Sequence, residues 1–148
     1  SAPLRRVLVP LDASPHAARA LDVLAGWPGL AGTTVVLLRA VVPLGLLGFS
    51  PPEAMLDVSA LADEEAEARA ALEDAAARLR ALGATVETRV ATTADPVGAI
   101  VDAARETGAE LVVMGARGLG GMARLTLGSV TDAVVRRGAR PVGIVRDR

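Results

Sequence analysis

Short apolar segments alternate along the chain with longer segments in which apolar residues recur every three or four positions. The short segments are apolar almost throughout, which is typical of strands that are covered on both faces of a parallel sheet. The longer segments have the period of amphipathic helices. Five strands are predicted, at residues 6–10, 34–42, 86–90, 111–114 and 141–145.

Signals for the ends of helices lie between these strands. Ser14 and Pro15 predict the start of a first helix, and Ser59 is a candidate cap for the second. Asp95, followed by proline, begins a third helix. Ser129, with an acidic residue three positions later, predicts a capping box for the last one. Glycines that can end these helices stand at 26, 83, 108 and 138.

The order of elements predicts an α/β fold. Strands that alternate with helices form a doubly wound parallel sheet with helices on both faces and right-handed crossovers. The third predicted strand alternates in polarity, which indicates a sheet edge. The length of 148 residues fits one domain, residues 1–148. No internal repeat is visible.

Composition excludes several classes of chemistry. The chain has no Cys and one His, which excludes disulfides, thiolate catalysis and His-rich metal sites. It has no Lys, which excludes a Walker A loop and Schiff-base chemistry. The only aromatic residues are Trp27 and Phe49, so a flat ligand would be held by aliphatic side chains and backbone.

Charge and hydropathy limit the classes of binding partner that we expect. The net charge is −1 and no basic stripe follows the chain, which disfavours a nucleic-acid partner. No apolar stretch is long enough to span a bilayer, and no signal-peptide pattern precedes the first strand. We expect a cytoplasmic protein that does not use a membrane.

Two segments at predicted strand ends are candidates for a ligand site. In open parallel sheets, ligands bind at the carboxyl ends of strands, where the winding reverses. Residues 10–14 follow the first strand and contain Asp12, and the glycine-rich residues 115–129 follow the fourth. If one ligand contacts both segments, the first and fourth strands are neighbours. The predicted strand order is therefore 3-2-1-4-5.

The glycine-rich segment has the features of a phosphate-binding loop. Gly115, Gly118 and Gly128 allow close approach of the backbone, and the start of the last helix favours an anion. The Ser129 hydroxyl can cap the helix and still donate to a phosphate. Arg117 could reach a phosphate or simply be solvated. The alternative is that the glycines only form turns and that Ser129 is only a cap.

Asp12 could accept hydrogen bonds from ribose hydroxyls or hold a metal beside the phosphates. The alternative is a local turn. Residues 118–123 match a G-x-G-x-x-A dinucleotide fingerprint, but that fingerprint belongs in the first strand–helix turn. No catalytic triad, paired acid and base, or metal cluster is apparent in the sequence.

These motifs resemble a known family. Gly115-x-x-Gly118, nine residues and then Gly128-Ser129 resembles the ATP-binding motif of the universal stress proteins. Residues 7–14, 111–115 and 140–145 are similar to the family's opening, fourth and closing strands. The resemblance covers the chain except for roughly residues 43–58.

The resemblance implies a five-stranded doubly wound fold and a homodimer joined through the last strands. It implies ATP as the ligand, with Mg²⁺ or Mn²⁺. By position, Asp12 would contact the ribose or the metal, and the backbone near Ala40 and Val41 would read adenine. The predicted nucleotide-binding residues are Pro10, Asp12, Ala40, Val41, Gly115, Arg117, Gly118, Gly128 and Ser129, with Asp12 also the metal ligand.

The resulting hypothesis is an ATP-binding stress-response protein that acts as a nucleotide-dependent switch or partner module. One alternative is a slow ATPase or self-phosphorylating enzyme using Ser129 or Thr126. Another is a module that only dimerises. The intact glycine spacing argues against the second alternative, and the absence of Lys and of an evident base argues against fast phosphoryl transfer.

Overall fold

The computed structural model describes residues 4–12, 15–43, 58–115, 129–138 and 140–145. The helices and strands, in chain order, are β1 (Arg6–Pro10), α1 (Pro15–Ala25), η1 (Leu30–Gly32), β2 (Thr34–Val41), α3 (Val58–Ala81), β3 (Thr85–Thr92), α4 (Pro96–Thr107), β4 (Leu111–Gly115), α6 (Ser129–Arg137) and β5 (Val142–Val145).

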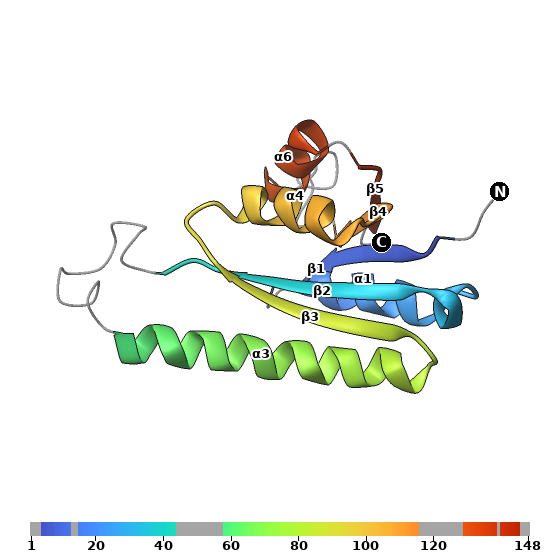
Figure 1. The fold of residues 1–148 in the computed structure, drawn as a ribbon, viewed down its shortest axis with the longest axis horizontal. Helices are drawn as coiled ribbons and strands as arrows, with labels where there is room; N and C mark the ends of the chain where they lie inside the picture. Colours follow the sequence, from blue (N-terminus) through green and yellow to red (C-terminus); the bar gives the residue numbers. More distant parts are fainter. Residues whose placement is uncertain (1–3, 13–14, 44–57, 116–128, 139, 146–148) are drawn as a thin grey trace.

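The five strands form one parallel sheet in the order β3-β2-β1-β4-β5. This confirms the predicted strand order and the α/β class. Helices α1 and α3 lie on one face of the sheet, and α4 and α6 lie on the other (Figure 1). The chain therefore reverses its direction of winding between β1 and β4.

Burial on both faces explains why the inner strands have no polar alternation. In β2, Val35 and Leu37 pack with α1 and α3, whereas Val36 and Leu38 pack with α4. All four side chains are almost completely buried. The segment that is covered on both faces, residues 35–38, is therefore apolar at every position.

Strand β3 is an edge, as its alternating sequence predicts. Val86 is buried in the core cluster that includes α3, whereas Glu87 is exposed. Arg80, from α3, donates through Nη2 to the carbonyl of Val86 at 2.9 Å. This contact covers part of an edge that would otherwise offer its backbone to another strand.

Most helix ends follow the predicted signals. Asp95 caps α4 by accepting from the N–H of Gly98 at 3.0 Å, and Gly83 and Gly108 follow their helices with φ of 97° and 68°. Ser59 is not a cap, because α3 already begins at Val58. Ser14 and the side chain of Ser129 lie outside the part of the chain that the structure describes.

Candidate functional site

Strands β1 and β4 separate at the carboxyl end of the sheet. Their register pairs Val7 with Leu111 and Leu8 with Val112, while β1 continues to Pro10. The carbonyl of Arg6 accepts from the N–H of Glu110, just before β4. The backbone N–H and C=O groups of the even-numbered residues of β1 therefore point toward β4. Pro10 has no N–H to offer there and ends the possible ladder. The two strand ends therefore diverge where the winding reverses, which is the usual place for a ligand.

The backbone just before Asp12 is held on both sides. The N–H of Leu11 donates to the carbonyl of Leu38 at 2.7 Å, and the carbonyl of Leu11 accepts from Nε of Arg39. Leu11 itself is buried and Asp12 is exposed. Asp12 thus follows an anchored residue at the carboxyl end of β1, as its predicted role requires.

Arg39 was not among the predicted site residues. It is half-buried on β2, between the apolar residues Leu38 and Ala40. An Arg at such a position in the sequence indicates a specific contact, because burying it requires a hydrogen-bond acceptor for the guanidinium. Here the acceptor is the carbonyl that precedes Asp12.

Ala40 and Val41 direct their backbone groups to opposite sides of β2. The carbonyl of Leu38 faces β1, since it accepts from Leu11, and the carbonyl of Val41 accepts from the N–H of Thr93 at 2.9 Å. The direction alternates along a strand, so the N–H and C=O of Ala40 point with Leu38 to the β1 side. Pro10, opposite Leu38, is the last residue of β1 in this register. The polar backbone of Ala40 therefore points beyond the end of β1.

The two ends of the glycine-rich segment lie where the prediction requires. Gly115 is the last residue of β4, paired with Val145, and Ser129 is the first residue of α6. Because β1 and β4 are neighbours, Asp12, just after β1, and Gly115, at the end of β4, both lie at the carboxyl end of the sheet. Three predicted residues, Arg117, Gly118 and Gly128, lie outside the described residues.

Asp12 suits a metal that is shared with phosphates. Within the described ranges, no group of three or more His, Asp or Glu side chains is arranged to hold a metal. Mg²⁺ is commonly bound by one or two carboxylates together with substrate phosphates, rather than by a complete protein cage. Asp12, an exposed carboxylate at the carboxyl end of β1, fits that pattern, and a metal held there would neutralise phosphate charge.

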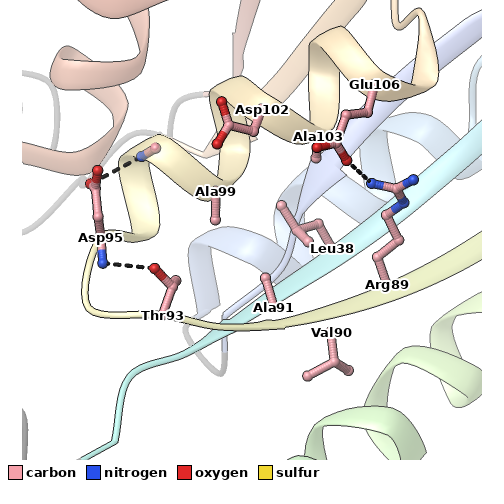
Figure 2. Close-up of a pocket in the computed structure, with 11 residues that line it drawn as sticks. Leu38, Arg89, Val90, Ala91, Thr93, Asp95, Ala99, Asp102, Ala103 and Glu106 are labelled. Atoms are coloured by element: carbon pink, nitrogen blue, oxygen red, sulfur yellow. Dashed lines mark hydrogen bonds and ion pairs between the residues drawn. The ribbon is translucent and has the colours of Figure 1, made fainter.

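A separate pocket of about 490 Å³ lies between β3 and α4. Its apolar wall is formed by Leu38, Ala91, Ala99 and Ala103, which converge between helix and sheet (Figure 2). At its rim, Arg89 pairs with Glu106 at 2.9 Å. Of the predicted nucleotide-binding residues that the structure describes, none lines this pocket.

Asp95 does more than cap a helix. Besides accepting from Gly98, it forms an ion pair with Arg137 of α6, whose two Nη atoms each lie 3.3 Å from a carboxylate oxygen. The hydrogen bond from the Gly98 N–H and then that from Arg137 hold the pKa of the Asp95 carboxyl below its usual range. The sequence predicted the cap but not the Arg137 contact.

No helix in the described part of the chain is long and apolar enough to cross a membrane. No curated protein matches the chain. Solved structures do. A universal stress protein in complex with cAMP is 30% identical, with a TM-score of 0.70 over 98% of both chains. The universal stress protein from Archaeoglobus fulgidus in complex with dAMP is 26% identical, with a TM-score of 0.64 over 97% of this chain and 98% of that one.

Universal stress protein UspA from Lactobacillus plantarum has the same fold. Its TM-score is 0.79 at 24% identity, over 99% of this chain and 100% of that one. The model of the universal stress protein family matches residues 3–146, nearly the whole chain. Together with the order of its five strands, this match shows that the chain belongs to the universal stress protein family.

Proposed function

We propose that this protein binds ATP with Mg²⁺ or Mn²⁺ at the carboxyl ends of β1 and β4 and acts as a nucleotide-dependent switch or partner module in a stress response. The observation that carries the proposal is the placement of Asp12 just after β1 and of Gly115 at the end of the adjacent strand β4, at the point where the winding reverses. The relatives with cAMP and dAMP support an adenine nucleotide as the ligand.

The backbone of Ala40 suits adenine. Its N–H and C=O point to the same side, beyond the end of β1, and offer a donor beside an acceptor. Adenine presents the complementary pair, the N1 acceptor beside the N6 amino donor. Guanine presents the reverse order, an N1–H donor beside the O6 acceptor. Val41 is unsuited to this role because its carbonyl already accepts from Thr93.

Calorimetric titration tests the proposal. ATP should bind more tightly with Mg²⁺ than without, and GTP should bind roughly ten- to a hundredfold more weakly, because mismatched polar groups lose about 1–3 kcal/mol. The absence of heat, and of protection from melting, at millimolar ATP would contradict nucleotide binding. Equal affinities for ATP and GTP would contradict base recognition by Ala40 alone.

The switch interpretation requires the bound nucleotide to persist. Phosphoryl transfer depends on positioning and on charge stabilisation, and the chain has no Lys to supply the latter. Nucleotide recovered after the titration should therefore still be ATP by chromatography. Conversion to ADP at several turnovers per second, lost in Asp12→Ala, would instead favour the enzyme.

We also propose a homodimer joined through β5. This strand is an edge of the sheet, paired on one side with β4, and an apolar edge invites pairing with a second copy. Light scattering at tens of micromolar protein should give the mass of a dimer. A monomer mass at that concentration would refute the proposal.

A further inference from the structure

The turn before α4 is joined to the far end of α6. Asp95 receives both Nη groups of Arg137, each at 3.3 Å, across 42 residues of sequence. The same carboxylate accepts from the N–H of Gly98, and the N–H of Asp95 donates to Oγ1 of Thr93 at 3.0 Å (Figure 2). Hydrogen bonds within its own turn therefore hold Asp95 in place, in addition to the ion pair with Arg137.

Gly98 leaves the space that this arrangement needs. A Cβ on Gly98 would collide with Oδ2 of Asp95 and lie 3.3 Å from Nη2 of Arg137. Gly98 is buried in the first turn of α4 and has no positive φ, so its backbone conformation does not require glycine. Close approach of the carboxylate and the guanidinium accounts for glycine here.

Helix α6 has few other anchors. Among its described side chains, which are those of residues 132–137, Val134 is the one that is buried, and it packs in the core beside α4. Two points define the direction of a helix. Val134 supplies one, and the Arg137–Asp95 ion pair supplies the other at the carboxyl-terminal end. Among the described side chains of α6, loss of the ion pair would leave Val134 as the one buried contact.

We propose that Asp95 and Arg137 are positioning residues of the nucleotide site, which set the direction of α6 so that its amino-terminal end is aligned with the phosphates. This inference rests on the proposed nucleotide binding at Ser129, the first residue of α6. The N-terminal amides of a helix act on an anion only when they point at it. The pair itself is about half exposed, so its effect on affinity is modest.

The test compares ATP with adenosine in two variants. Asp95→Asn keeps an oxygen that can accept from Gly98 but loses the ion pair. Arg137→Gln loses the ion pair from the other side. Both variants should bind ATP about two- to fivefold more weakly, with adenosine affinity unchanged, because only the phosphates meet α6. The double variant should be no weaker than either single one, since both remove one interaction.

The two substitutions change the net charge in opposite directions, which separates alignment from bulk electrostatics. Arg136→Gln is the matched control: it lies on the same helix, loses the same charge and breaks the pair with Asp132 instead. It should leave the ratio of ATP to adenosine affinity near that of the wild type.

Two results would overturn the inference: tighter ATP binding in Asp95→Asn with weaker binding in Arg137→Gln, or equal losses of ATP and adenosine affinity. A wild type that binds no ATP would instead reject the proposed function, before any variant is compared.

Discussion

Asp12→Ala should weaken the binding of ATP by roughly ten- to a hundredfold, which is the loss expected when a charged hydrogen-bond acceptor is removed from a ligand. The carboxylate is exposed and stands directly after Leu11, whose N–H and C=O are both engaged. Its removal should therefore leave the backbone of the site in place. Isothermal titration measures the loss, with and without Mg²⁺.

The dependence on metal distinguishes two roles for this side chain. If Asp12 holds the metal, Mg²⁺ improves ATP binding in the wild type and no longer does so in Asp12→Ala. If Asp12 accepts only from the ribose, both proteins respond equally to Mg²⁺ and the variant also loses affinity for adenosine. Asp102→Ala is the matched control, since it removes an exposed carboxylate that pairs with Arg105 on α4. An ATP affinity loss of equal size in both variants would contradict a contact between Asp12 and the ligand or its metal.

The fold was predictable because its main determinants are local. Strands buried on both faces must be apolar throughout, as in residues 35–38, and glycine, proline and Asp95 mark the ends of helices. The order 3-2-1-4-5 followed from one further assumption, that a single ligand contacts two loops. The predicted cap at Ser59 is wrong, because α3 begins at Val58, two residues earlier than a cap at Ser59 implies.

The site was predictable at its ends and not in its internal contacts. Asp12 lies just after β1, Gly115 ends β4 and Ser129 begins α6, so the signals for strand and helix ends place all three. The direction of the Ala40 backbone depends on the register between β1 and β2, which no local pattern encodes. The pairing of Asp95 with Arg137 joins residues far apart in sequence, and it becomes visible only when α4 and α6 lie side by side.

Leu8→Ala should lower the free energy of unfolding by about 2–5 kcal/mol, a large share of the 5–15 kcal/mol typical of a domain. Leu8 lies in the strand between β2 and β4, has no exposed surface and packs in the cluster beneath α4 and α6. With one Trp and one Phe in the chain, leucines are among the largest fully buried side chains. The described residues of this cluster include no aromatic side chain that could fill the cavity.

Leu82→Ala makes the same chemical change where it should matter little. Leu82 follows α3 and is 48% exposed. The free energy of unfolding should fall by no more than about 0.5 kcal/mol, as for other surface substitutions. Urea unfolding at one fixed protein concentration measures both variants, since dimerisation would make stability depend on concentration. Equal losses of unfolding free energy in the two variants would contradict a core centred on β1. A large loss in Leu8→Ala alone would support the packing of β1 against α4 and α6, the helices that the proposed nucleotide site depends on.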